Sequence, residues 1–223
     1  NSMPSHPIRR LAPILAFFVW TFAQPGGALP HAAAQAPESA GLADQLLKED
    51  PQALAAEALA KGDARRGAIV FHQPQLACTR CHSTGEKPSP LGPDLSRRDE
   101  RVTVEFLLDA VLRPSKAVRK GYESYVVVTA DGRSLAGLLA KKTDEAVILR
   151  DATSGKMIEI AAADIDEIVP SKQSAMPPGL ANLVGSRQQF LDLVRYLSDI
   201  GEGGPARADE LRPAAAFFAL PPL

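Results

Sequence analysis

Cysteine is nearly absent from this chain, since its 223 residues include only Cys78 and Cys81. A scaffold stapled by several disulfides is therefore excluded, and the spacing of this pair is too tight for it to cross-link a domain. An excess of charge is absent as well, because 25 basic residues offset 26 acidic ones. A protein that binds nucleic acid carries a basic footprint, so we expect no nucleic-acid partner.

Long apolar runs are also missing. The N-terminal apolar run, residues 11–22, has about a dozen residues, whereas about 20 are needed to span a bilayer. Two arginines precede this run and a stretch of small residues follows it, which is the pattern of a secretory signal peptide. We therefore predict a signal peptide over residues 1–34 and a periplasmic or otherwise exported protein, with membrane attachment only if this segment stays uncleaved.

Helical patterns occupy both ends of the remaining chain. Helices are expected after Asp50 and Asp63, from Thr103 to Pro114, and after Ser186, because apolar residues recur there at helical spacing. Aspartate and serine are suited to cap the first turns of such helices, and proline ends the third one.

The middle of the chain has a different period. Five short β-like runs lie within residues 122–169, separated by turn-forming pairs, which indicates a small antiparallel sheet or barrel. Residues 201–223 are rich in Gly, Pro and Ala and are expected to form a poorly packed tail or linker. The predicted fold class is mainly α, with a helical domain over residues 42–200 that is interrupted by the β insert 122–169.

The two cysteines belong to a Cys-x-x-Cys-His stretch that ends at His82. Covalent haem attachment requires two thiols one helical turn apart and an adjacent imidazole for the iron, so it uses all three residues. A zinc site needs further ligands from distant histidines, and a thioredoxin-like pair needs a thiolate at a helix start after a strand. A chance occurrence on a surface loop is the fourth reading. Covalent haem attachment is the hypothesis that these residues favour.

The surroundings of this stretch strengthen that hypothesis. Gly67 and Phe71 share one face of the preceding helix, and Gly92-Pro93-Asp94-Leu95 follows the motif. Together with the motif, these features over residues 62–113 and 171–200 resemble the class I c-type cytochromes. The resemblance implies a cytochrome c-like helical domain in which Tyr196 packs against Gly67 and Phe71.

The same resemblance implies the roles of the site residues. Haem c would be bonded covalently to Cys78 and Cys81, and His82 would be one axial ligand of the iron. The other ring nitrogen of His82 would donate a hydrogen bond to the carbonyl oxygen of Pro93, which fixes the plane of the imidazole.

The sixth iron ligand has three candidates in the sequence, namely His72, Met157 and Met176. Met157 lies in an alternating strand run and is expected to be a core residue. His72 is too close to the attachment turn to reach the opposite face of a haem. Met176 lies in a Pro- and Gly-rich loop before the last helix, where class I cytochromes carry their thioether ligand, so we predict Met176 as the axial ligand.

The order of these segments is similar to that of a narrower group, the haem-binding domains with a β insert attached to propeller dehydrogenase-like proteins. This resemblance implies an electron-transfer protein rather than an enzyme: a periplasmic monohaem cytochrome carrying single electrons from a dehydrogenase-like donor to a terminal oxidase or another cytochrome. One alternative is a haem-based ligand sensor or peroxidase-like enzyme with an open sixth iron position. Another makes the β insert a binding module and the haem merely structural.

Overall fold

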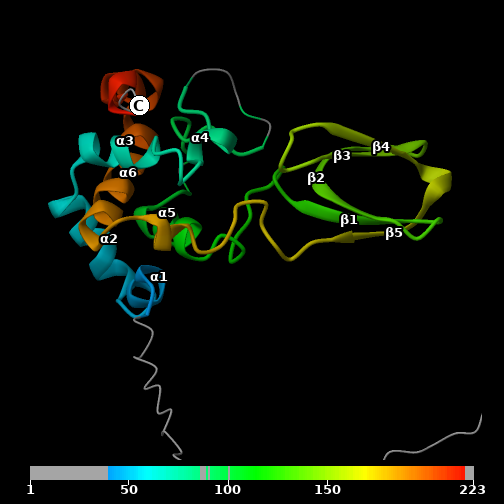
Figure 1. The fold of residues 1–223 in the computed structure, drawn as a ribbon, viewed down its shortest axis with the longest axis horizontal. Coiled ribbons are helices and arrows are strands. Elements are labelled where there is room, and N and C mark those ends of the chain that lie inside the picture. The colour runs from blue at the N-terminus through cyan, green and yellow to red at the C-terminus, as the bar shows by residue number, and fades with distance from the viewer. Residues whose placement is uncertain (1–39, 86–88, 90, 100, 219–223) are drawn as a thin grey trace, which may run out of the picture. The chain divides into compact units, whose positions relative to one another are not determined.

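The computed structural model describes residues 40–218 apart from 86–88, 90 and 100, so the predicted signal peptide lies outside the described residues. Five helices come first along the chain and a sixth follows the strands (Figure 1). They are α1 (Leu42–Leu46), α2 (Pro51–Lys61), α3 (Ala64–Phe71), α4 (Cys78–Cys81), α5 (Val104–Leu112) and α6 (Arg187–Leu211). None of the helices within the described residues is both long and apolar enough to cross a membrane.

The predicted mainly α class is wrong, because the chain combines helices with a five-stranded antiparallel sheet. The strands are β1 (Ser124–Thr129), β2 (Ser134–Lys142), β3 (Ala146–Arg150), β4 (Met157–Ala161) and β5 (Ile165–Pro170). They pair in the order β4-β3-β2-β1-β5, so β4 and β5 are edge strands and the sheet is open (Figure 1). The strands bury an apolar cluster of their own, so the sheet is a second structural layer and not merely an insert in a helical domain.

The sheet's core follows from its alternation of side chains. Val127, Val147, Leu149 and Ile160 are buried in one cluster on the sheet. Met157 is 51% exposed, so the expectation that it is a core residue is wrong. It lies on edge strand β4, where the burial pattern alternates and only Ile160 is buried. A period of two therefore places Met157 on the outward face.

Local capping explains where the helices begin. The carboxylate of Asp50 accepts a hydrogen bond from the amide of Ala53 at 2.8 Å, and that of Asp63 accepts from the amide of Arg66 at 2.9 Å. Thr103 and Ser186 cap α5 and α6 in the same way. Each cap satisfies an amide that has no partner within the first helical turn.

Helices α3 and α6 cross in very close contact, and this crossing is the centre of the helical part. A Cβ atom on Gly67 would lie 1.9 Å from the carbonyl oxygen of Asp192. The rings of Phe71 and Tyr196 pack with their centroids 5.4 Å apart, and both side chains are buried. The expected contact of Gly67 and Phe71 with Tyr196 is therefore present.

A buried carboxylate holds the same crossing together. Asp192 on α6 is 1% exposed and accepts hydrogen bonds from the amide of Asp63 and from the guanidinium of Arg66, both at 2.8 Å. Burial alone raises the pKa of Asp192, but these bonds and one from Gln188 outweigh it and lower the pKa. Asp192 therefore stays charged and ties the start of α3 to the middle of α6.

The stretch after residue 200 is not the poorly packed tail that its composition predicts. Helix α6 continues to Leu211 across a kink at Gly204, whose φ is 71°, and Pro205. Ala208 and Leu211 are 1% and 3% exposed within the helical core. A Cβ atom on Gly85 would lie 2.5 Å from the Cβ of Pro205, so this second part of α6 closes against the loop that follows the Cys-x-x-Cys-His stretch.

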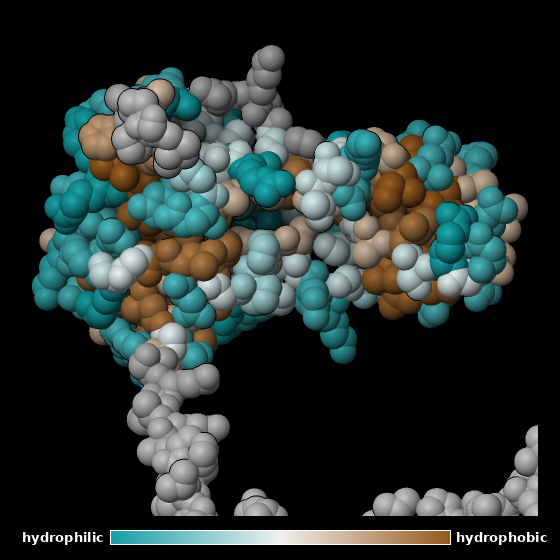
Figure 2. Space-filling view, in the orientation of Figure 1, coloured by the Kyte–Doolittle hydropathy of each residue, from teal (hydrophilic) through white to brown (hydrophobic). Residues whose placement is uncertain are grey.

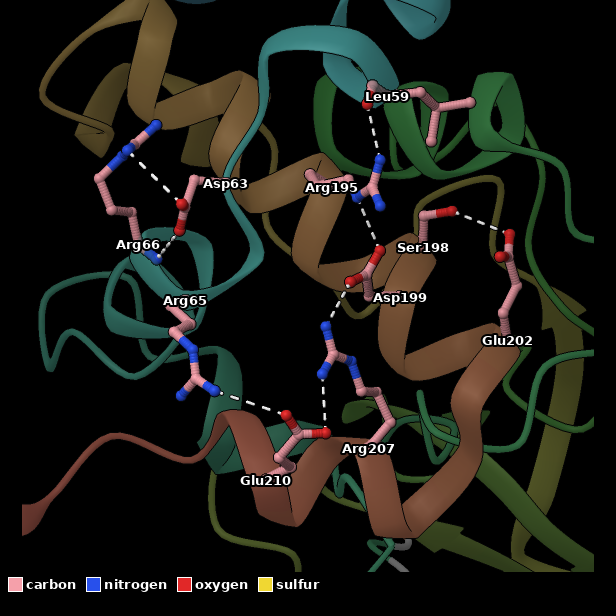
Figure 3. A network of polar contacts seen from close by, with 10 residues as sticks. All are labelled: Leu59, Asp63, Arg65, Arg66, Arg195, Ser198, Asp199, Glu202, Arg207 and Glu210. Carbon is pink, nitrogen blue, oxygen red and sulfur yellow. Dashed lines mark hydrogen bonds and ion pairs between the residues drawn. The ribbon is translucent and has the colours of Figure 1, made fainter.

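Ion pairs hold the second part of α6 in place. Arg207 lies between two carboxylates (Figure 3). It is 3.0 Å from that of Asp199 and 2.7 Å from that of Glu210. Asp199 also accepts from Arg195 at 2.7 Å, and Glu210 lies 3.4 Å from Arg65 on α3. The expectation of a linker is therefore wrong for residues 201–211, and residues 219–223 lie outside the described part of the chain.

Candidate functional site

The two cysteines and His82 lie on a single tight turn. Helix α4 spans Cys78–Cys81, so the two thiols are one helical turn apart, and the amide of His82 donates to the carbonyl oxygen of Cys78 at 2.9 Å. Ala77 precedes the helix in the left-handed region, with φ of 54°. A residue with a Cβ is rarely found there, so the surrounding structure holds this entry turn in place.

The imidazole of His82 is oriented by one hydrogen bond. Its Nδ1 lies 3.0 Å from the carbonyl oxygen of Pro93, which is the contact that the resemblance implies. A carbonyl oxygen only accepts, so the proton of the neutral ring is on Nδ1 and Nε2 keeps a lone pair. Burial lowers the pKa of His82, although the bond to Pro93 acts in the opposite direction. The ring is therefore held in the neutral form that binds metal ions.

Gly92 makes room for this ring. A Cβ atom at residue 92 would lie 2.9 Å from Cε1 of His82 and 2.9 Å from the carbonyl oxygen of Cys81. Any side chain at this position would push away the imidazole or the turn that carries Cys78 and Cys81. The loop is fixed further by the amide of Leu95, which donates to the carbonyl oxygen of Ser83 at 2.9 Å.

A cavity of about 720 Å³ opens at this turn, and Cys78, Cys81, His82 and Met176 all line it. Its volume lies within the range of about 300 to 1,000 Å³ that is typical of cofactor sites. The walls are largely apolar and come from the loop after His82, from α5 and from the segment that leads into α6. They include Leu76, Leu91, Leu95, Val102, Phe106 and Leu107.

Met176 belongs to the segment between β5 and α6. It is half-buried against the helical core, and its amide donates to the hydroxyl of Ser174 at 3.1 Å. Of the three ligand candidates in the sequence, Met176 is the one that lines the cavity. His72 packs elsewhere, against Phe71 and Tyr196.

The two thiols do not have the properties of a reactive redox pair. Burial raises the pKa of Cys78 to about 11, and burial also raises the pKa of Cys81 against the opposing charge of Arg80. A catalytic thiol of the thioredoxin type needs a lowered pKa. The zinc-site reading is not supported either, since the described residues hold no cluster of three or more His, Cys, Asp or Glu side chains arranged for a metal ion.

Three arginines also line the cavity, namely Arg80, Arg98 and Arg119. Arg80 lies inside the Cys-x-x-Cys-His stretch, so its position next to the thiols could have been inferred from α4 alone. Arg98 and Arg119 reach the cavity from loops, and no periodic pattern marks them. No protein-family model matches this chain, and no curated protein matches it either.

Proposed function

We propose that this chain is an exported monohaem c-type cytochrome that carries single electrons. In this proposal haem c would be bonded to Cys78 and Cys81, and the side chains of His82 and Met176 would hold its iron. One observation carries the proposal: two thiols one turn apart, a neutral imidazole and a thioether all line the same largely apolar cavity. No other constellation in the described residues combines a nitrogen ligand, a sulfur ligand and two attachment thiols.

The residues present suit such a cofactor. The thiols of Cys78 and Cys81 are free, and a bond through each would retain the cofactor where the surrounding core is small. Gly92 and the carbonyl group of Pro93 fix the plane of the His82 ring, so that Nε2 is the nitrogen left for a metal. When bound, the haem supplies one-electron chemistry that no side chain offers.

The remaining roles belong to the cavity walls and to Met176. Leucine, valine and phenylalanine side chains line the cavity and exclude water, which lowers the local dielectric constant. A low dielectric constant would disfavour the more highly charged, ferric state of the iron. A thioether ligand is soft and favours ferrous iron over ferric iron, which raises the reduction potential relative to two imidazoles. We therefore infer an electron carrier between a dehydrogenase-like donor and a terminal oxidase or another cytochrome.

The experiment is expression with a haem-attachment system, followed by intact mass and a pyridine haemochrome spectrum. We expect the mass of one covalently bound haem and a c-type spectrum, both lost in the Cys78→Ser, Cys81→Ser double variant. Thr79→Ala is the matched control, because Thr79 is exposed between the two cysteines and should keep the haem. A colourless wild-type protein in which both thiols can be alkylated would refute the proposal.

The same sample separates an electron carrier from a ligand sensor or peroxidase-like enzyme. We expect a thioether-to-ferric charge-transfer band that disappears in Met176→Ala and persists in Met157→Ala, since Met157 is exposed and does not line the cavity. Carbon monoxide should bind rapidly only to the Met176→Ala protein. Rapid binding to the wild type would show an open iron position and favour the sensor or enzyme.

A further inference from the structure

Met176 lies in a segment, residues 171–179, that forms neither helix nor strand. Ordering such a segment costs conformational entropy, so its position requires specific contacts. At its start, the amide of Ser171 donates to the carbonyl oxygen of Ser124 at 2.8 Å, which continues the pairing of β5 with β1. The helices and the sheet each bury an apolar cluster of their own, and more polar residues lie between them on the face that Figure 2 shows. Individual hydrogen bonds, rather than a shared core, therefore hold this segment where it leaves the sheet.

Two serine hydroxyls hold the middle of the segment. The amide of Ser174 donates to the hydroxyl oxygen of Ser115 at 3.1 Å, and the amide of Met176 donates to the hydroxyl oxygen of Ser174 at 3.1 Å. The first bond joins residues 59 positions apart, whereas the second is local. We call Ser115 and Ser174 the serine pair. The pair connects the backbone of Met176 to the turn that follows α5.

The turn that carries Ser115 is itself held to α5. The amide of Lys116 donates to the carbonyl oxygen of Arg113 at 2.8 Å. The carboxylate of Asp109 on α5 forms ion pairs with the side chains of both Arg113 and Lys116. Pro114, directly before Ser115, is buried and lines the cavity. The hydroxyl of Ser115 is therefore a fixed point beside the wall of the cavity that α5 forms.

The residues after Met176 leave its backbone little freedom. Pro177 and Pro178 fix their own φ angles, and a residue that precedes proline is disfavoured in the helical conformation. Further along the chain, the side-chain oxygen of Asn182 accepts from the amide of Ala43 on α1 at 2.8 Å. Because the chain is stiff on this side, the direction in which the Met176 side chain leaves the backbone depends on the contacts before it, at the serine pair.

From these contacts, and resting on the proposed function, we propose that Ser115 and Ser174 are positioning residues for the thioether of Met176. Their hydroxyls hold two amides of the segment and so keep the thioether at the cavity, where it would bind the iron. The sheet takes part as well, since the pairing of β1 with β5 brings together the two segments that the serine pair joins. The serine pair slows the departure of the thioether from the iron and leaves the chemistry of the iron unchanged.

The test measures how often the thioether leaves the iron. Carbon monoxide binds to the reduced protein only while the sixth position is free, so its rate of binding in stopped-flow mixing reports this event. We expect Ser115→Ala and Ser174→Ala each to speed this binding about three- to tenfold, the effect of losing one hydrogen bond. The thioether-to-ferric band should weaken at unchanged haem content. Deuterium exchange should become faster at the Ser174 amide in the first variant and at the Met176 amide in the second.

Two matched variants separate the hydroxyls from the surrounding fold. Ser115→Thr keeps the hydroxyl at an exposed position with room for a methyl group, and should have the wild-type rate. Ser134→Ala removes an exposed hydroxyl on β2 that does not line the cavity, and should stay within about twofold of the wild-type rate.

Wild-type rates of carbon monoxide binding in both Ser115→Ala and Ser174→Ala would overturn the inference. A Ser115→Thr protein that binds carbon monoxide as fast as Ser115→Ala would overturn it too, because the hydroxyl would then not be the group that positions Met176. A wild-type protein that is colourless, or that binds carbon monoxide as rapidly as Met176→Ala, would refute the proposed function instead.

Discussion

Replacing Gly67 by alanine tests the crossing of α3 and α6 most directly. The new Cβ would lie 1.9 Å from the carbonyl oxygen of Asp192 and 2.7 Å from the Cβ of Tyr196, whereas ordinary contact begins at 3.4 Å. The nearest atoms belong to the backbone of α6 and cannot rotate away, so the two helices would have to separate by more than an ångström. Such a shift would loosen the packing of Phe71 against Tyr196.

The magnitude follows from two opposing effects. Overpacking a tight core costs about 1 to 3 kcal/mol, and the rigid backbone contact places this case at the upper end. Alanine returns about 1 kcal/mol through its better helix propensity. We expect Gly67→Ala to lower the free energy of unfolding by about 2 kcal/mol or more, a large part of the stability of a domain.

Chemical denaturation followed by far-UV circular dichroism measures this loss. Gly201→Ala is the control, because its Cβ would meet only the flexible side chain of Arg98, at 3.0 Å, and we expect a change within about 1 kcal/mol. If Gly67→Ala is as stable as the wild type, the helices do not approach as closely as described.

Two further predictions concern the site and the acid stability of the fold. In Gly92→Ala the new Cβ would meet the His82 ring at 2.9 Å, so we expect a displaced imidazole and a weakened hydrogen bond to Pro93. If the proposed haem is bound, the weakened His82 ligand should be replaced faster by carbon monoxide in the reduced protein. An unchanged rate would contradict the close contact between Gly92 and His82. Hydrogen bonds from Arg187, then Lys61, lower the pKa of Glu57 from 4.5 to about 2. The contribution of Glu57 to stability is therefore present above about pH 4.5 and is lost as the pH falls toward 2. Glu57→Gln should be less stable than the wild type at pH 7 and should lose less stability on acidification. Parallel pH profiles of the two proteins would show that this ion pair contributes nothing to stability.

The parts of the structure that depend on neighbouring residues could be predicted from the sequence. Asp50, Asp63 and Ser186 cap helices because a side-chain oxygen reaches an amide three residues on, which needs no tertiary information. The hydrogen bond between His82 and Pro93 was also expected, but only from the resemblance of this stretch to the class I c-type cytochromes.

The errors come from contacts between distant parts of the chain. Residues 201–211 have the composition of a linker, but Ala208 and Leu211 are buried in the helical core and Glu210 lies 3.4 Å from Arg65 on α3, none of which the local pattern shows. The fold class failed for a related reason. Strands were expected between residues 122 and 169. Their pairing into an open sheet with its own apolar cluster was not, and it makes the β part more than an insert in a helical domain.

The contact between Gly85 and Pro205 has a consequence for how the protein is made. A chain that emerges from the ribosome N-terminus first presents the turn with both thiols long before the end of α6 exists. The loop behind that turn gains its contact with Pro205 only after the chain has been extended through that residue. During this interval the loop that follows the two thiols lacks one of its neighbours in the folded chain, so α6 is the last described helix to settle against this part of the molecule.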